Sequence, residues 1–437
     1  AHRFVRGSIS LHFYAINMID LKKFRENPEF FVTAAASKGA VVEAELILSL
    51  DAKVRALKQL IQRIKAKKND ASAIIPKSSP EEKTRLIEAM RALDKEVIEP
   101  EQSLKELEGE LDEKLYRIPN PPLPEVIVAA SEDSNEVLRE VGVRPNFDFP
   151  IKDHVDIAKG LGILDLDQAA KASGSRFAYL LGLGAKLELA LVSLAIEVAE
   201  SQGFIPVSVP HLVTAQTMKA MGFLEHGGQD EIYYLPKDNL YLIGTSEQAL
   251  GALHEGEILD LASPKRYVGF SPCYRREAGS HGKDTKGILR MHQFTKVEMF
   301  SFCTAEQSGG EHDLMLAIEE ELLGMLGLPY HLLSIVSGDL GLPAAKKWDL
   351  ECWIPSQERF RETHSTSNCT DFQARRLNIR YSQDKELHFA HTVNGTALAI
   401  GRILIAILEN FQQADGSVVL PRVLAERLGQ ERLVPGN

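Results

Sequence analysis

Basic residues and glycines gather in a loop that joins two strand-like runs of the sequence. The first run ends at Arg275, and the second begins near Phe294 and reaches Glu298. Because a guanidinium group can bind two phosphate oxygens at once, such a hairpin is typical of a phosphate site. A charged surface hairpin would have a similar composition, but strand alternation would then leave Glu298 among apolar neighbours, where it needs a cationic partner. The basic residues of the loop are Arg276, Lys283, Lys286 and Arg290.

A second candidate for phosphate binding lies at the start of an apolar helix near the C-terminus. Residues 394–410 predict a strand that turns into a helix, with Arg402 in the first turns of that helix. A lone arginine on an apolar helix is unfavourable unless an anion pairs with it. A nucleotide phosphate and a structural carboxylate would serve equally well, so this residue alone leaves both open.

The elements that precede these residues have a different composition. Residues 41–116 are strongly charged, and their apolar residues repeat at spacings of three and four in two segments, which predicts a heptad-like seam. Between the segments lies a turn-rich stretch, residues 69–80, that no helix should cross comfortably. We therefore predict an antiparallel helical hairpin with about 28 residues per helix, roughly 40 Å long, and a kink at Pro100.

The first arm helix carries a basic stripe with no acidic residue between positions 52 and 68. Such a stripe suits a nucleic-acid backbone and would make binding depend on salt. The second helix is net acidic, so the alternative is a solvated coiled coil whose charges pair between helices, and the stripe taken alone favours that alternative. The stripe consists of Lys53, Arg55, Lys58, Arg63, Lys65, Lys67 and Lys68.

Composition limits the function classes further. The net charge of −11 argues against a surface that is basic throughout, but a local basic face is enough to bind nucleic acid. No run approaches roughly 20 consecutive apolar residues, so we expect no membrane span. The four cysteines have no metal-ligand spacing and are too few for a disulfide framework, so we expect no zinc site and a reducing compartment.

A proline-rich linker, residues 119–128, divides the chain into an arm domain, residues 18–118, and a second domain, residues 129–437. In the second domain strands cluster with few helices between them, which predicts an α+β fold with an antiparallel sheet. Residues 1–17 contain no acidic residue and precede Met18. We expect them to be a segment added for expression, with the remnant of an organellar leader as the alternative.

The segments that carry the chemistry resemble the three motifs of class II aminoacyl-tRNA synthetases. Residues 274–298 resemble motif 2, and residues 395–410 resemble motif 3. Residues 187–210, a helix followed by Gly-Phe-Ile-Pro-Val-Ser-Val-Pro, resemble motif 1, the element through which that class forms dimers. The resemblance implies a core of antiparallel sheet flanked by helices.

Within that class, the chain resembles the seryl-tRNA synthetases of the bacterial type. Residues 244–247 resemble the loop that binds serine in this family, and residues 290–298, 367–376 and 408–417 are family signatures. With the arm, the resemblance covers nearly all of residues 18–425. It implies ATP-dependent activation of L-serine to seryl-adenylate and transfer to the 3′ end of a serine tRNA, with selenocysteine tRNA left open as a further acceptor.

The resemblance also implies roles for single residues. Arg275, Glu298 and Arg402 would be catalytic. The ATP site would consist of Arg275, Arg276, Glu277, Arg290, Met291, Phe294, Glu362, Thr363, His364, Ser365 and Arg402. The serine site would consist of Thr245, Ser246, Glu247, Arg275, Glu298, Asn394 and Thr396. Glu362 and Ser365 would hold Mg²⁺, and the basic stripe of the arm would bind tRNA.

The implied partners are L-serine, ATP, serine tRNA and a second copy of the chain. We expect this homodimer in the cytoplasm, with an organelle matrix as the alternative, and no association with a membrane.

Two features depart from the family pattern. Thr363 and His364 stand where the family has isoleucine and serine, and the arm is somewhat shorter than in bacterial relatives. We expect His364 to point away from the site. Two other functions compete: a related amino acid–carrier protein ligase, and a silent paralogue that binds only RNA or a protein. The basic arm argues against the first, and the retained charged residues of both substrate sites argue against the second.

Overall fold

The computed structural model describes residues 19–224, 228–278 and 286–435, and the chain forms two compact units, Ala1–Pro119 and Asn120–Asn437. The expected leader and Lys283 of the basic loop lie outside the described residues.

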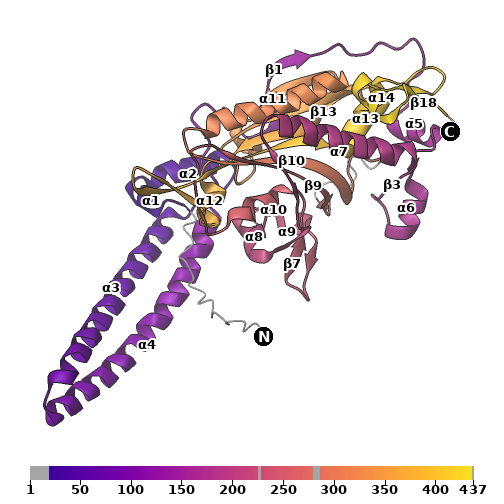
Figure 1. The fold of residues 1–437 in the computed structure, drawn as a ribbon. Coiled ribbons are helices and arrows are strands. Elements are labelled where there is room, and N and C mark those ends of the chain that lie inside the picture. The colour runs from indigo at the N-terminus through magenta and orange to yellow at the C-terminus, as the bar shows by residue number, and fades with distance from the viewer. Residues whose placement is uncertain (1–18, 225–227, 279–285, 436–437) are drawn as a thin grey trace, which may run out of the picture. The chain divides into compact units, whose positions relative to one another are not determined.

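Two long antiparallel helices make up most of the N-terminal unit (Figure 1). α3 (Ala44–Ile74) has 31 residues and α4 (Pro80–Tyr116) has 37. At 1.5 Å per residue they are about 46 Å and about 55 Å long, so the arm is longer than predicted. Their apolar seam packs at its base on α1 (Leu21–Glu26) and α2 (Pro28–Ser37). The predicted helical hairpin is confirmed.

The connection between the two helices is shorter than the sequence predicted. α3 continues through residues 69–74 and is followed by a 3-10 turn, Ile75–Lys77, so the prediction that no helix crosses this stretch was wrong for its first half. No glycine or proline interrupts residues 69–74, and packing against α4 supports the last turns of the helix. Ser79 caps the start of α4, and the helix continues through Pro100.

An eight-stranded sheet forms the centre of the C-terminal unit, in the order β1-β11-β12-β13-β16-β10-β9-β4. All neighbouring strands are antiparallel except β4 and β9, so the predicted antiparallel sheet is confirmed. The strands are β1 (Glu136–Val141), β4 (Ile205–Ser208), β9 (Lys265–Tyr274), β10 (Gln293–Cys303), β11 (Tyr330–Ser334), β12 (Lys346–Ile354), β13 (Arg359–Asn368) and β16 (His391–Ala399).

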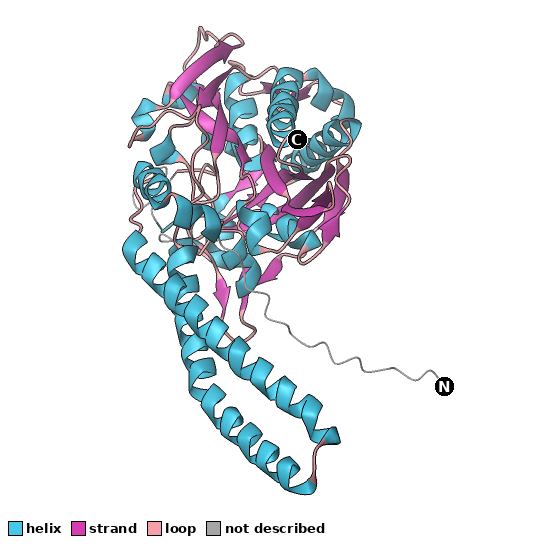
Figure 2. Cartoon of the chain, turned by 90° about the vertical axis from the view of Figure 1, so that its left-hand side faces the viewer, coloured by secondary structure: helices cyan, strands magenta, loops and turns pink. Residues whose placement is uncertain are grey.

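Three helices cover one face of this sheet (Figures 1 and 2). α7 (Leu183–Ser201), α11 (Ser308–Leu326) and α13 (Ile400–Asn410) contact the central strands, and α7 contacts the other two helices. Their apolar side chains bury Val297 and Met299 of β10 in the largest core of the protein. Because side chains alternate along a strand, Glu298, which lies between these two residues, points to the opposite face of the sheet.

Shorter elements surround the sheet. The helices are α5 (His154–Gly160), α6 (Leu166–Ser173), α8 (Ala215–Ala220), α9 (Gly228–Glu231), α10 (Glu247–Gly251), α12 (Phe372–Arg376) and α14 (Arg422–Leu428). Four small sheets contain β2 (Leu164–Asp165), β3 (Tyr179–Leu180), β5 (Leu212–Thr214), β6 (Tyr234–Leu235), β7 (Leu240–Leu242), β8 (Ile258–Leu259), β14 (Arg380–Gln383), β15 (Glu386–Phe389), β17 (Val418–Val419) and β18 (Arg432–Leu433). Within the described residues, no helix is both long enough and apolar enough to cross a membrane.

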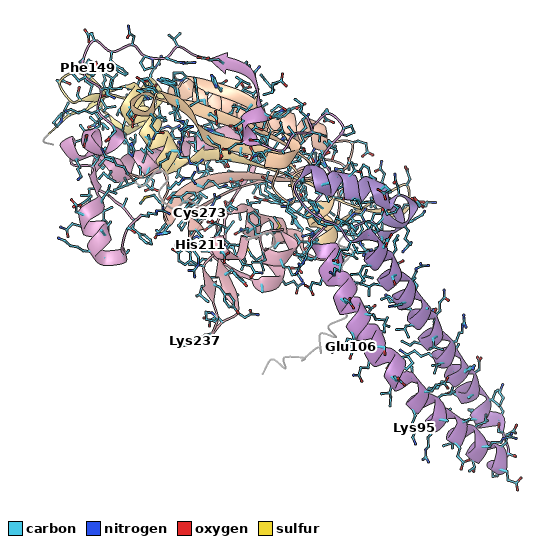
Figure 3. The ribbon with its side chains drawn as sticks, turned by 180° about the vertical axis from the view of Figure 1, so that it is seen from behind. Lys95, Glu106, Phe149, His211, Lys237 and Cys273 are labelled. Carbon is cyan, nitrogen blue, oxygen red and sulfur yellow. The ribbon has the colours of Figure 1, made fainter. Side chains whose placement is uncertain are left out.

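All four cysteines of the chain are fully buried and free of disulfides. Cys273 lies on β9 (Figure 3), and the others are Cys303, Cys352 and Cys369. Burial raises the pKa of Cys273 and of Cys303, and it raises the pKa of Cys352 to about 12.

Candidate active site

One cavity of about 220 Å³ lies where the β9–β10 hairpin meets β13, β16 and the start of α13. Residues two apart on a strand point to the same face, which is why several side chains of β10 and β16 reach it. The predicted site residues that line the cavity are Glu247, Arg275, Glu277, Met291, Phe294, Glu298, Glu362, Thr363, Ser365, Asn394, Thr396 and Arg402.

Arg275 directly follows β9 and is held by backbone groups on two sides. Its backbone N–H donates to the carbonyl oxygen of His292 (3.0 Å), and its Nε donates to the carbonyl oxygen of Gly244 (3.1 Å). The guanidinium carbon lies 5.3 Å from the centre of the Phe294 ring. A fixed guanidinium group beside an aromatic face suits a nucleotide, whose phosphate needs the first and whose base needs the second.

Glu277 has a left-handed backbone conformation with φ of +52°, which is unfavourable for a residue with a side chain. Its carbonyl oxygen accepts a hydrogen bond from Arg176 (3.2 Å). Its carboxylate pairs with Arg290, with 3.4 Å between Arg290 Nη1 and Glu277 Oε2. Two arginines therefore hold Glu277 in this conformation at the cavity wall.

Arg402 in the first turn of α13 has a carboxylate partner. Its Nη1 donates to the backbone oxygen of Glu362 (2.7 Å) and to Oε1 of the same residue (3.1 Å). Burial raises the pKa of Glu362, but the positive charges of Arg402 and Lys347 outweigh burial and lower it below its ordinary value. Of the two anions that the sequence left open, the structure pairs Arg402 with the carboxylate, and both groups line the cavity.

A buried acid lies next to the two predicted metal ligands, Glu362 and Ser365 of β13. Asp349 of β12 pairs with Lys347 (3.2 Å) and faces Ser365 across the two strands. Burial raises the pKa of Asp349 to about 6, and its Oδ1 has no hydrogen-bond partner among the described residues. Asp349 is not part of the described cavity lining and lies behind Ser365, which is.

Glu298 lies two strand positions beyond Lys296 and has the cationic partner that its sequence context demands. The two residues form a buried ion pair on one face of β10. Thr396 of β16 donates from its hydroxyl to Glu298 Oε2 (3.4 Å), and Lys296 Nζ lies 3.4 Å from the same hydroxyl oxygen. This end of the cavity thus combines a carboxylate, a hydroxyl and an ammonium group.

Glu247 at the start of α10 is the second carboxyl group at this end of the cavity. Its Oε1 accepts hydrogen bonds from the side-chain amides of Gln373 (2.9 Å) and Asn394 (3.2 Å). Burial raises the pKa of Glu247 to about 7, and the negative charge of Glu298 acts in the same direction. Near neutral pH, Glu247 therefore exchanges between its neutral and ionised forms.

Thr245 and Ser246 do not line the cavity in the part of the chain that the structure describes. Thr245 Oγ1 accepts a hydrogen bond from the backbone N–H of Glu247 (3.2 Å), and Ser246 Oγ donates to the carbonyl oxygen of Gly269 (3.2 Å). Both residues shape the turn that presents Glu247, and their contact with serine stays a prediction.

Arg276, Arg290 and His364 also lie outside the described lining. Arg276 donates to the carbonyl oxygen of Ile232 (3.0 Å), and Arg290 reaches the cavity through Glu277. His364 is fully buried beside Thr363, and burial lowers its pKa to about 3, so its ring is neutral. The assignment of these three residues to the ATP site stays a prediction.

Sequence reasoning missed three residues of this region. Lys296 alternates with Phe294 and Glu298 on β10, a spacing that could have revealed it. Gln373 lies inside a family signature, but the sequence predicts no role for it in the site. Glu319 is an acid on the buried face of α11, and its helical spacing from apolar core residues was the available signal.

Charges of the arm, described within the N-terminal unit alone, divide into two groups. Lys58 pairs with Glu108 (2.8 Å), Lys65 pairs with Glu101 (2.8 Å), Lys68 pairs with Asp94, and Arg55 pairs with Asp51 (3.0 Å). Lys53, Arg63 and Lys67 have no ion-pair partner within the described residues. The coiled-coil interpretation thus accounts for part of the basic stripe and leaves three cations over.

Two protein-family models match the chain. The seryl-tRNA synthetase N-terminal domain matches residues 18–122, and the class II tRNA synthetase core domain (G, H, P, S and T) matches residues 233–411.

Full-length relatives match as well. The chain is 45% identical to the serine–tRNA ligase of Acidothermus cellulolyticus over 422 residues, which cover 96% of this chain and 100% of the relative. It is 44% identical to the serine–tRNA ligase of Thermobifida fusca, over 96% and 99% of the two chains. The solved seryl-tRNA synthetase of Pyrococcus horikoshii complexed with ATP is similar with a TM-score of 0.87 and 38% identity, over 96% of this chain and 100% of that one.

Proposed function

The chain belongs to the seryl-tRNA synthetase family, and from this premise we propose how its cavity activates L-serine with ATP before the seryl group passes to a serine tRNA. One observation carries the proposal. A single cavity joins an arginine and an aromatic ring that suit a nucleotide to carboxyl and hydroxyl groups that suit an amino acid. The reaction joins the serine carboxylate to the α-phosphate of ATP and releases pyrophosphate, so catalysis consists mainly of holding these groups in contact.

ATP occupies the part of the cavity next to Arg275. The guanidinium group of Arg275 binds the α-phosphate, and the adenine ring stacks on Phe294, whose face lies 5.3 Å from that group. Glu277 accepts a hydrogen bond from the adenine amino group, and Arg402 binds the γ-phosphate. Both arginines concentrate positive charge where negative charge develops in the transition state, which is the main electrostatic contribution to such a reaction.

Serine occupies the part of the cavity next to Glu298. Its ammonium group binds the carboxylates of Glu298 and Glu247, and its hydroxyl group bonds Glu298 and Thr396, which already contact each other. Asn394 supports the site through its hydrogen bond to Glu247. Alanine lacks the hydroxyl group and would leave these buried polar groups unpaired, which opposes its activation. We expect size to exclude threonine.

Glu362 and Ser365 fit a magnesium ion, because both line the cavity and offer the oxygen ligands that Mg²⁺ prefers. No cluster of three or more His, Cys, Asp or Glu side chains in the described residues could hold a metal by itself, which agrees with an ion that also takes water and phosphate oxygens. When bound, Mg²⁺ would neutralise charge on the ATP phosphates. The protein would contribute Glu362 as a ligand, and Arg402 orients that side chain.

Two exposed apolar residues support a homodimer. Leu189 of α7 is 69% exposed, and Ile205 of the edge strand β4 is 57% exposed. Both lie in the segment that resembles the dimer-forming motif, and exposed apolar side chains on neighbouring elements are typical of an interface. We place this dimer in the cytoplasm.

Pyrophosphate exchange tests the proposed function directly. The wild-type protein should exchange labelled pyrophosphate into ATP with serine but not with alanine or threonine, and should charge a serine tRNA. Arg275→Ala should lose exchange by at least about a hundredfold, because it removes a charged contact to the transition state. Exchange without charging would show that another molecule accepts the seryl group, and no exchange with serine would refute the proposal.

A further inference from the structure

A buried ammonium group occupies the amino acid end of the cavity. The side chain of Lys296 is only 10% exposed, and it pairs with Glu298, whose side chain is 2% exposed. Its Nζ also lies 3.4 Å from the hydroxyl oxygen of Thr396. A cation of the protein therefore already bonds the two groups that the proposed function gives to serine.

The position of Lys296 along β10 places it between the two substrates. Phe294, Lys296 and Glu298 alternate on one face of the strand, and all three line the cavity. Neighbours on one face of a strand are about 7 Å apart. Lys296 thus lies between the ring that stacks on adenine and the carboxylate that binds the serine ammonium group. The serine carboxylate must meet the α-phosphate in this interval.

Serine is a zwitterion, so it can exchange partners with a buried ion pair instead of merely breaking it. Separating Lys296 from Glu298 without replacement would leave two uncompensated buried charges, which is strongly unfavourable. Serine supplies an ammonium group for Glu298 and a carboxylate for Lys296 in the same binding event. A ligand with only one of these charges would leave one member of the pair unsatisfied.

We propose that Lys296 is a further catalytic residue, which pairs with Glu298 before serine binds and contacts the serine carboxylate and the α-phosphate once both substrates are bound. This inference rests on the proposed function. In the reaction, a serine carboxylate oxygen forms a bond to the α-phosphorus while the bond from that phosphorus to the pyrophosphate oxygen breaks. The Lys296 ammonium group forms no covalent bond in this step, and its charge stabilises the negative charge on the α-phosphate oxygens.

A combination of variants and serine analogues tests the contact. Ethanolamine keeps the ammonium and hydroxyl groups of serine and lacks the carboxylate. In the wild-type protein serine should bind more tightly than ethanolamine, as measured by calorimetry. Lys296→Gln should shrink the ratio of the two dissociation constants by at least about tenfold and reduce serine-dependent pyrophosphate exchange by at least about a hundredfold.

Lys346→Gln is the matched control. Lys346 of β12 pairs with Glu125 (3.2 Å) and is not part of the described cavity lining. Its replacement should therefore change neither the ratio of dissociation constants nor the rate of pyrophosphate exchange. If Lys296→Gln keeps the wild-type ratio and exchanges within about threefold of wild type, the pair is only structural and the inference is overturned. Failure of the wild-type protein to exchange pyrophosphate with serine would instead refute the proposed function itself.

Lys296→Arg keeps the charge and serves if the glutamine variant does not fold. The inference then expects a thermal unfolding midpoint close to wild type and exchange at least about tenfold slower, because the wider guanidinium group moves the charge away from the reacting atoms. Wild-type exchange in Lys296→Arg, or an equal loss of exchange in Lys346→Gln, would overturn it.

Discussion

Three buried carboxyl groups lie near the serine end of the cavity, and each is stabilised differently. Glu298 is paired with an ammonium group, whereas Glu247 accepts hydrogen bonds from two amides. Glu319 of α11 has no hydrogen-bond partner for either oxygen within the described residues. Because an unpaired buried carboxylate is very unfavourable, burial raises the pKa of Glu247 and that of Glu319.

Glu247 should make serine binding depend on pH. Its pKa is raised to about 7, so it is ionised above that pH and neutral below it. A neutral carboxyl group binds an ammonium ion poorly, so KM for serine in pyrophosphate exchange should be about tenfold higher at pH 6 than at pH 8. Glu247→Gln should remove this dependence and keep KM high at both values. A wild-type KM that is flat from pH 6 to pH 8 would contradict the role.

Glu319 should destabilise the fold at alkaline pH. Burial raises its pKa well above the ordinary value, and the negative charges of Glu298 and Asp349 add to the effect. A group whose pKa is higher in the folded than in the unfolded state contributes stability at low pH and loses it as the pH rises through the folded value.

Glu319→Gln keeps the shape of the side chain and removes the ionisation. The difference between its thermal unfolding midpoint and that of the wild type should therefore increase in favour of the variant as the pH rises from 6 to 9, as measured by calorimetry. Glu321→Gln, at an exposed position of the same helix, should follow wild type. An advantage of Glu319→Gln that stays constant from pH 6 to pH 9 would show that Glu319 is already ionised in the folded protein.

At the scale of elements, the strands, the long helices and the hairpin arm could be predicted from the sequence, because the apolar residues of each recur with a clear period. The cavity residues on β10 could also be predicted from the sequence, since alternation places Phe294 and Glu298 on the same face of the strand. The partner of Arg402 could not be predicted. Its carboxylate comes from β13, forty positions earlier, and no local pattern encodes that pairing. The end of α3 was misjudged because packing on α4 outweighed the weak helix propensity of residues 69–74.

The arm gives a prediction about which cations bind tRNA. A lysine already paired with an acid has part of its charge neutralised, so Lys53, Arg63 and Lys67 should contribute more to tRNA binding than Lys58, Lys65 and Lys68. Replacing the first three by glutamine should raise KM for tRNA by about tenfold and flatten its dependence on salt. The matched triple variant of the paired lysines should raise KM less, and both should exchange pyrophosphate at the wild-type rate. Equal effects on KM would show that pairing within the arm is irrelevant.

At the scale of the whole molecule, the two units have separate apolar cores. All residues of the cavity belong to the C-terminal unit, and the candidate tRNA-binding cations belong to the N-terminal one. On the proposed assignment, a variant of the arm cations should lose tRNA charging and keep adenylate formation, whereas a variant of the cavity should lose both activities, because charging consumes the adenylate.

The proposed dimer can be tested at its most exposed apolar residue. Leu189→Asp places a charge on α7 where a partner would bury it, so light scattering at micromolar concentration should show a monomer in place of a dimer. Leu253→Asp is the control, because Leu253 is 45% exposed outside the motif that resembles a dimer element. A wild-type protein that is already monomeric, or a Leu189→Asp protein that stays dimeric, would contradict this interface.

The four buried thiols make the protein a ready subject for single-molecule fluorescence. Maleimide dyes react with accessible thiolates, and the native cysteines are fully buried, with a raised pKa at Cys273, Cys303 and Cys352. A cysteine introduced at Lys77, at the tip of the arm, and another at the exposed Lys237 would be labelled without removal of any native thiol. Energy transfer between the two dyes would then report in real time whether the distance between the two labelled positions changes as tRNA arrives and leaves.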